Sequence, residues 1–161
     1  MINSRSLKKI EEQDYDLYYP IRAEKKNLWW TGYDNAPDYD AFFNWFKSRA
    51  NDPNRHIYLL LDNDVCIGAL HLDFYSDHSF IGYNIKEQHE GKGYATYMVQ
   101  KAIEIAFKRP NIKSMKAWIN YQNEGSMRVS EKNGFVKSGI TETRKRFGVD
   151  ELYNLYQFVP Q

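Results

Sequence analysis

The sequence predicts a single α+β domain over residues 1–161, in which an antiparallel meander precedes a strand–helix–strand crossover. Three apolar segments in the middle of the chain are joined by short polar turns, as in a β-meander. A glycine-rich loop, an amphipathic helix and another apolar segment follow, an order that places two strands parallel in one sheet. A hydrophobic content of 42% and a charged content of 27% suit one soluble globular domain.

The first third of the chain predicts one short strand and two helices. The strand is expected over Leu7 to Ile10, and the helices are expected within Asp14 to Trp30 and within Tyr39 to Ala50. A turn over residues 31–37 separates the helices, and Asp38 suits the N-cap of the second one.

Three strands are expected in the middle of the chain. They cover His56 to Leu61, Cys66 to Tyr75 and Phe80 to Ile85. The polar segments 62–64 and 76–79 between them are short enough for tight turns. Strands joined in this way pair antiparallel and form the meander.

The element after the meander is the clearest helix of the chain. Apolar residues recur at helical spacing from Ala95 to Phe107, and Pro110 ends the pattern. A strand is expected over Met115 to Ile119, parallel to the strand that precedes the helix.

The last part of the chain predicts a short helix and a hairpin. Asn123 is a good N-cap, and the Asn-Gly pair at 133–134 is typical of a helix end. The final strands, Phe135 to Thr143 and Glu151 to Val159, are expected to pair around a turn that contains Gly148.

The loop from Gln88 to Thr96 leads directly into the long helix and suits an anionic ligand. The first turn of a helix leaves backbone N–H groups without intrahelical partners and carries partial positive charge. Gly91 and Gly93 let an oxyanion approach the bare backbone closely. The loop therefore predicts a ligand that carries phosphate.

Charge is distributed unevenly along the chain. Residues 86–146 hold 13 Lys and Arg against 6 Asp and Glu, although the whole chain has a net charge of only +1. One interpretation is a basic lobe for a polyphosphate cofactor and an acidic lobe for a cationic substrate. A solvated lysine-rich surface is the other interpretation. Nucleic acid is not expected, because no basic run is interleaved with stacking aromatic residues.

Two other phosphate-binding motifs do not fit the glycine loop. The dinucleotide fingerprint requires a third glycine where this chain has Thr96, and an acidic residue where the next strand ends in Asn120. The nucleoside-triphosphate loop requires Gly-Lys-Ser or Gly-Lys-Thr, which is missing here.

Neither a disulfide nor a metal site is expected. The single cysteine, Cys66, has no intramolecular partner and lies in an apolar run, which indicates a buried structural thiol. The polar side chains of His71, Asp73, Asp77 and His78 follow no recognisable metal-ligand spacing.

Two spaced motifs resemble the GCN5-related N-acetyltransferase (GNAT) family. Gln88, Gly91 and Gly93 match the Gln/Arg-x-x-Gly-x-Gly/Ala loop of that family. Residues 123–126, Asn-Glu-Gly-Ser, and residues 131–135, Glu-Lys-Asn-Gly-Phe, match a second segment in the branch of the ribosomal-protein acetyltransferases RimJ and RimL. The resemblance implies a GNAT-like three-layer fold, with a central mixed, mostly antiparallel six- to seven-stranded sheet that is splayed at the cofactor site and flanked by helices.

The resemblance also implies acetyl-CoA (coenzyme A) as co-substrate. The backbone of Asn84, Ile85 and Lys86 would then bind the pantetheine arm. The pyrophosphate would lie on the amides that follow Gln88 in the loop, which belong to His89, Glu90, Gly91, Lys92, Gly93, Tyr94, Ala95 and Thr96. The side chains of Lys92 and Thr96 could add to this contact, and Lys132 could reach the nucleotide end, with solvated surface lysines as the alternative for Lys92 and Lys132. Asn123 and Ser126 would line the same site.

The implied reaction is direct acetyl transfer from the thioester to a primary amine in a ternary complex. Backbone N–H groups near Tyr83 to Ile85 are candidates to bind the oxyanion. Many relatives have a tyrosine near the leaving thiolate where this chain has Ser130, so the role could pass to Ser126, or to Asn123 through a water. A first-turn capping role for Ser126 stays open as the alternative.

The general base is not evident from the sequence. The glutamate that relatives often carry before the loop is missing from residues 80–84. His71 and Asp73 alternate onto one face of the preceding strand and are the best substitutes, although a structural histidine or removal of the proton by water would also fit.

The acceptor is not identified by any motif. A protein N-terminus, an amino sugar or a polyamine would all provide the amine, and the aromatic segment from Trp29 to Asp34 would suit a pocket for it. A non-catalytic acyl-CoA-binding regulatory module is the alternative function. We expect a cytoplasmic monomer or homodimer with no membrane contact, because the longest aliphatic run, residues 57–61, is far too short to span a bilayer.

Overall fold

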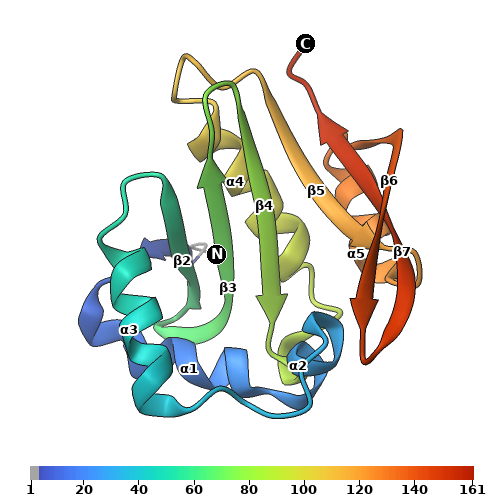
Figure 1. Ribbon diagram of the computed structural model, residues 1–161. Helices are drawn as coiled ribbons and strands as arrows, with labels where there is room; N and C mark the ends of the chain where they lie inside the picture. Colours follow the sequence, from blue (N-terminus) through green and yellow to red (C-terminus); the bar gives the residue numbers. More distant parts are fainter. Residues whose placement is uncertain (1–3) are drawn as a thin grey trace.

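A computed structural model describes residues 4–161 as a mixed seven-stranded sheet with helices on both faces (Figure 1). The strand order is β1-β2-β3-β4-β5-β7-β6, and every neighbouring pair is antiparallel except β4 and β5. The strands are β1 (Arg5–Lys9), β2 (Arg55–Asp62), β3 (Val65–Phe74), β4 (His78–Ile85), β5 (Ser114–Asn120), β6 (Val136–Arg146) and β7 (Val149–Phe158).

Five α-helices form the two outer layers over the described residues 4–161. They are α1 (Tyr15–Ala23), α2 (Lys25–Thr31), α3 (Tyr39–Ala50), α4 (Tyr94–Ala106) and α5 (Glu124–Lys132), with short 3-10 turns at Glu12–Asp14 and Glu87–His89. Helices α1 to α3 lie on one side of the sheet, and α4 and α5 lie on the other (Figure 1). The predicted three-layer fold with a mixed, mostly antiparallel sheet is therefore confirmed.

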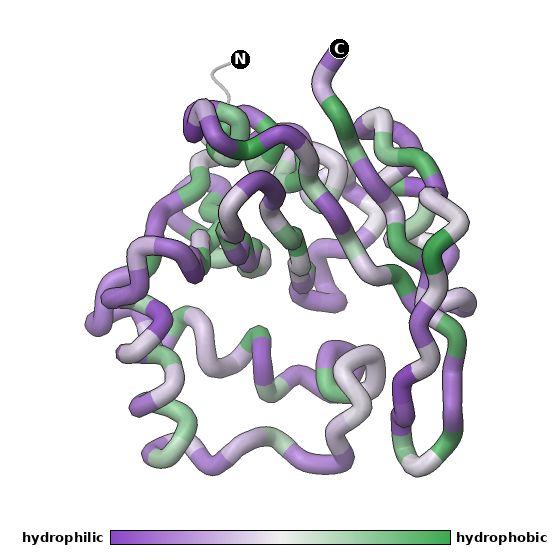
Figure 2. The backbone as a smooth tube through the Cα atoms, turned by 45° about the horizontal axis from the view of Figure 1, so that its top comes forward, coloured by the Kyte–Doolittle hydropathy of each residue, from purple (hydrophilic) through white to green (hydrophobic). Residues whose placement is uncertain are grey.

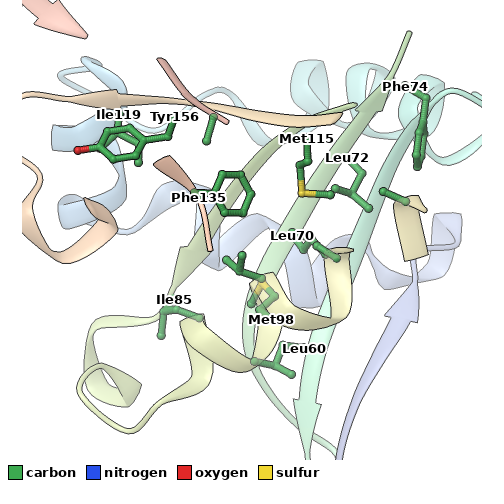
Figure 3. Close-up of a cluster of buried hydrophobic side chains, with 14 of the residues drawn as sticks. Leu60, Leu70, Leu72, Phe74, Ile85, Met98, Met115, Ile119, Phe135 and Tyr156 are labelled. Atoms are coloured by element: carbon green, nitrogen blue, oxygen red, sulfur yellow. The ribbon is translucent and has the colours of Figure 1, made fainter. Parts of the chain in front are cut away.

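Each face of the sheet has its own apolar core, because side chains alternate along a strand. Leu70 and Leu72 of β3 pack with Met98 of α4 on one face (Figure 3). Ala69 of β3 packs with Phe46 of α3 on the other. Cys66 belongs to this second core and is 5% exposed, so the prediction of a buried thiol is confirmed.

Strands β4 and β5 are parallel neighbours, as the crossover predicts, but they stay paired over only a short stretch. They pair only over His78–Phe80 and Ser114–Lys116, at one end of each strand. Beyond Phe80 the two strands diverge, and the opening between them widens toward the end of β4 (Figure 1). The sheet is splayed at this point, and the chain that leaves β4 enters the glycine loop.

The structure corrects several element boundaries, and β1 covers Arg5–Lys9 instead of Leu7 to Ile10. The helix expected within Asp14 to Trp30 is two helices, because Glu24 is extended (φ −65°, ψ 135°) and its carboxylate accepts a hydrogen bond of 2.8 Å from the backbone N–H of Glu87. His78 and Ser79 were expected in a turn, but they belong to β4 because they pair with β5. Strand β6 continues to Arg146 instead of Thr143.

The β6–β7 hairpin reaches back to the N-terminal helices, and Figure 2 shows its tip beside the segment that follows α2. The guanidinium of Arg146 forms two hydrogen bonds with the Glu151 carboxylate, at 2.6 and 2.9 Å, and donates a third to the Trp29 carbonyl at 2.8 Å. Both side chains are nearly buried. This contact fixes α2 next to the opening between β4 and β5.

Candidate active site

The glycine loop presents bare backbone at the start of α4. Gly91 (φ +72°) and Gly93 (φ +82°) adopt left-handed conformations, and a Cβ atom at either position would meet nothing within 4 Å. Gly93 caps the helix without a side-chain hydrogen bond, and the first intrahelical bond is Tyr97 N–H to Gly93 carbonyl at 3.1 Å. The amides of Tyr94, Ala95 and Thr96 therefore lack intrahelical partners, as an anion site requires.

These residues form one wall of an open cleft of about 660 Å³. Its other walls come from α2, the end of β4, and α5 with the residues just before it. Lys26 and Glu90 form an ion pair across the cleft, which neutralises the loop carboxylate, whereas Lys132 forms no ion pair with residues 4–161. The lining residues are Lys26, Asn27, Trp30, Tyr83, Asn84, Ile85, His89, Glu90, Gly91, Gly93, Tyr94, Ala95, Thr96, Gln122, Asn123, Glu124, Gly125, Ser126, Arg128, Val129 and Lys132.

The end of β4 leaves backbone hydrogen-bonding groups open toward the gap. The Lys86 N–H donates to the Ile67 carbonyl at 2.9 Å, so Asn84, two residues earlier, also directs its N–H and C=O toward β3. The backbone groups of Tyr83 and Ile85 point the other way, toward β5, which no longer pairs with β4 there. Of the three expected pantetheine partners, Ile85 alone offers backbone groups on this side.

Close pairing of β3 and β4 depends on Gly68. A Cβ atom at this position would lie 2.3 Å from the Asn84 carbonyl oxygen, a distance that no side chain tolerates. The glycine lets β3 hold the end of β4 in place while β5 turns away.

Helix α5 contributes Asn123 and Ser126 to the gap. The Asn123 side chain caps the helix by accepting a hydrogen bond of 3.1 Å from the Ser126 N–H. The capping contact uses the amide of Ser126 and leaves its hydroxyl beside the phenol group of Tyr83. Asn123 is thus held in place by its own helix.

The buried hydroxyl of Tyr83 has no hydrogen-bond partner of good geometry among residues 4–161. Burial raises the pKa of Tyr83, and its contact with the Ser126 hydroxyl lowers the pKa by a smaller amount. The phenol is therefore protonated at neutral pH and can donate a hydrogen bond. A buried donor without a partner is costly unless a ligand satisfies it.

A second cavity of about 470 Å³ opens on the face of the sheet covered by α1 to α3. It shares five residues with the cleft, so the two spaces meet in the gap between β4 and β5: Trp30, Tyr83, Asn84, Asn123 and Ser126. Ser130 is 3% exposed and lines the second cavity only.

His71 and Asp73 also line the second cavity, where each has a neighbour on the N-terminal helices. His71 Nε2 lies 2.8 Å from the Tyr18 hydroxyl, and burial, with smaller effects of Arg49 and Arg22, lowers the pKa of His71 to about 3. Asp73 accepts a hydrogen bond of 2.8 Å from Arg49. A base role for either residue stays a prediction, and the low pKa makes His71 a weak base.

Three expected cofactor residues do not line the cleft. Lys86 uses its amide in the sheet, and Gln88 has its side-chain amide 3.2 Å from the ring of His89. The Lys92 carbonyl is 3.5 Å from a guanidinium nitrogen of Arg5. The remaining twelve expected cofactor residues line the cleft, as stated above.

The sequence did not point to the side chains of Tyr83, Arg22 and Arg49, which line the second cavity. Alternation along β4 could have placed Tyr83 on the α4 face together with Ile85. The two arginines lie on separate helices and carry no motif. Trp30 and Trp45 line the cavity as well, whereas Trp29 packs on Arg146.

The described part of the chain shows no group of three or more His, Cys, Asp or Glu side chains that could hold a metal ion. None of the helices within residues 4–161 is long and apolar enough to cross a membrane.

Comparison with known proteins identifies the family. Residues 6–136 match the family described as "Acetyltransferase (GNAT) domain". The "Probable N-acetyltransferase YjcK" of Bacillus subtilis is 30% identical over 142 residues, which cover 88% of this chain and 72% of that protein.

Solved structures show the same fold. The spermidine N-acetyltransferase of Vibrio cholerae, in complex with CoA and spermine, aligns with a TM-score of 0.86 and 16% identity over 97% of this chain and 95% of that one. A GNAT-family acetyltransferase from Bacillus anthracis aligns with a TM-score of 0.84 and 15% identity over 99% and 96% of the two chains. The chain thus belongs to the GNAT acetyltransferase family and is an acyltransferase.

Proposed function

We propose that this protein transfers an acetyl group from acetyl-CoA to a primary amine of a small molecule or a protein N-terminus. One observation carries the proposal: the glycine-loop cleft and the second cavity meet between β4 and β5, where Tyr83, Asn123 and Ser126 line both. A donor in one space and an acceptor in the other would meet at these residues. Proximity of this kind supplies much of the catalysis in a ternary complex.

The residues of the cleft fit the parts of coenzyme A. The amides of Tyr94 to Thr96 would bind the pyrophosphate, because helix starts favour anions and these amides lack intrahelical partners. The free N–H and C=O groups of Ile85 would pair with the pantetheine amides. Lys132 and Arg128, on the α5 wall, would approach the nucleotide phosphate.

In the reaction, the amine nitrogen bonds to the acetyl carbon, the carbon–sulfur bond breaks, and the thiolate leaves. The N–H group of Tyr83 is the candidate to stabilise the oxyanion, because it faces the gap without a partner strand and the Ile85 N–H is assigned to the pantetheine. The Tyr83 phenol would donate its unused hydrogen bond to the departing sulfur. Ser126 lies beside it and would orient the phenol.

Tyr83 thereby takes the part that the resemblance gives to a tyrosine at position 130, where this chain has serine. A thiol has a pKa of about 8.5, below that of a phenol, so the phenol would stabilise the thiolate by hydrogen bonding and keep its proton. The amine would lose its proton to water in the open cavity, since His71 is a weak base.

Titration calorimetry with acetyl-CoA and a thiol-release assay test the proposal. We expect binding in the micromolar range and release of free CoA that depends on an added amine. A CoA-free nucleotide such as ADP, which has the pyrophosphate without the pantetheine arm, serves as the matched ligand control and should bind more weakly. Lack of binding at high micromolar acetyl-CoA would overturn the proposal.

A further inference from the structure

The second cavity is lined by two guanidinium groups, those of Arg22 on α1 and Arg49 on α3. Arg49 is only 5% exposed and donates to Asp73 at 2.8 Å. Its Nε has no hydrogen-bond partner among residues 4–161. A buried guanidinium with an unused donor is costly by itself and is satisfied when a ligand supplies an acceptor.

Arg22 has even fewer polar partners. Its guanidinium lies 4.8 Å from the ring centroid of Tyr33 and 5.8 Å from that of Phe42. Its single hydrogen bond within residues 4–161, to the Thr31 hydroxyl, is 3.5 Å long. It forms no ion pair with any residue from 4 to 161. The aromatic rings hold the planar group in position and leave most of its donors free.

The charge of the cavity is therefore positive. Asp73 is the only carboxylate among the described residues that line it, and Arg55 shares this carboxylate at 3.7 Å in addition to Arg49. His71 adds no charge at neutral pH, because its pKa is about 3. A polycationic amine would place further positive charge next to two guanidinium groups, and the one carboxylate of the lining is already paired with arginine.

We infer that the acceptor is an amine that also carries a carboxylate, as an amino acid does, and that polyamines are poor acceptors. The inference rests on the proposed acetyl transfer and names its substrate class. The carboxylate would accept hydrogen bonds from Arg22 and from the unused Nε of Arg49, which would leave the amine directed toward the gap between β4 and β5. Arginine donors arranged in a plane suit a carboxylate geometrically. The acidic lobe expected from the charge distribution along the chain does not form at this cavity.

Matched acceptor pairs test the inference in the thiol-release assay. The panel consists of the twenty amino acids, their carboxamides, which lack the charge but keep the amine, and spermidine and spermine. We expect the best amino acid to exceed its own carboxamide by about 10- to 100-fold in kcat/KM, because the carboxamide leaves the guanidinium groups unsatisfied. Both polyamines should react more slowly still.

The outcomes separate this inference from the proposed function. If a carboxamide or a polyamine matches the best amino acid, acetyl transfer stands and the carboxylate requirement is wrong. If no carboxylate-bearing amine is acetylated, the inference is also overturned, whether or not calorimetry detects acetyl-CoA binding. The proposed function fails only in the binding experiment or when no amine of any kind releases CoA.

Substitution of Arg22 links the preference to this cavity. In Arg22→Gln the ratio of kcat/KM for the amino acid to kcat/KM for its carboxamide should fall toward one. The Kd for acetyl-CoA should stay within about twofold of the wild-type value, which would show that the protein is folded. Lys145→Gln removes the same charge from an exposed site, where the side chain is 73% exposed, and should keep the wild-type ratio. An unchanged ratio in Arg22→Gln would contradict the assignment of Arg22 to the acceptor carboxylate.

Discussion

The glycine-loop cleft, which we propose binds the cofactor, and the second cavity, which we propose binds the acceptor and call the acceptor cavity, meet at the same gap but are built from different parts of the chain. The cleft depends on backbone: the amides at the start of α4, two glycines with positive φ and the open edge of β4. The cavity depends on side chains from several elements, among them Arg22, Arg49 and His71. Backbone binds what is common to every acyl-CoA, whereas side chains can differ between family members without disturbing the sheet. We therefore expect cofactor binding and acceptor choice to respond separately to mutation.

We expect the largest effect on cofactor binding, without a change in acceptor choice, for Gly91→Asp. The new carboxylate would stand where the phosphate is expected, in open space beside the helix start. We predict at least a 100-fold rise in the Kd for acetyl-CoA, measured by calorimetry.

Gly148→Asp is the matched control for this change. Gly148 also has a positive φ, of +76°, and a Cβ atom there also meets nothing within 4 Å, but it lies in the β6–β7 turn. Both variants carry the same backbone strain of about 1 kcal/mol, so their melting temperatures should fall alike. Equal loss of cofactor affinity in both would show that strain, not the phosphate site, is responsible.

The sequence alone predicts features that contiguous residues form, and it does not predict contacts between distant residues. The meander, the crossover and the glycine loop are visible because each depends on contiguous residues with a regular period. The sequence does not indicate the break at Glu24, because the hydrogen bond that the Glu24 carboxylate accepts there comes from the N–H of Glu87, which is distant in the sequence. His78 and Ser79 were missed as strand residues because pairing with β5 overrides their turn-like composition.

The site follows the same rule. Most residues that line the cleft at the glycine loop could be named in advance, since a helix start and its glycines are local features. Arg22 and Arg49 could not, because α1 and α3 bring them to one cavity only after the helices pack on the sheet. The importance of Tyr83 depends on a missing partner for its hydroxyl, a property that no sequence pattern reports.

Tyr83 lies at the junction of the two regions, so its hydroxyl should affect turnover and neither binding step. We predict that Tyr83→Phe lowers kcat by about 100-fold, the loss typical of one donor to developing charge. The unfolding free energy should change little, because the hydroxyl has no hydrogen bond of good geometry to lose among residues 4–161. Tyr156→Phe is the control, since Tyr156 is a buried tyrosine, 2% exposed, that lines neither space. A Tyr83→Phe enzyme with normal kcat would exclude the phenol from the reaction.

The free energy of unfolding should depend on pH, because burial and two nearby arginines lower the pKa of His71 in the acceptor cavity. His71 has a pKa of about 3 in the folded protein against 6.5 in an unfolded chain. Between these values the unfolded chain binds a proton that the folded chain does not, so the free energy of unfolding falls as the pH drops from 6.5 toward 3. At pH 4.5 this proton uptake lowers the free energy of unfolding by about 2–3 kcal/mol, and above pH 6.5 it has no effect.

His71→Gln removes this proton uptake and can keep a hydrogen bond with the Tyr18 hydroxyl. Urea unfolding of both proteins at pH 7 and pH 4.5 measures the difference. The wild type should lose about 2–3 kcal/mol more than the variant on acidification. The same loss in both proteins would mean that His71 titrates normally and that the cavity is wetter and less positive than its lining indicates.

The smallest effect is expected at Ser126, whose hydroxyl supports the Tyr83 phenol while its amide completes the helix cap. Ser126→Ala keeps that amide, so α5 and the Kd for acetyl-CoA should be unchanged, and kcat should fall by about 10-fold. Ser130→Ala is the comparison, because Ser130 occupies the position of the tyrosine in relatives and lines the acceptor cavity without the cleft. A larger loss in Ser130→Ala than in Ser126→Ala would transfer the supporting role to Ser130. Since Ser130 lines only the acceptor cavity, that result would also place the leaving sulfur deeper on the acceptor side of the gap than Tyr83 and Ser126 indicate.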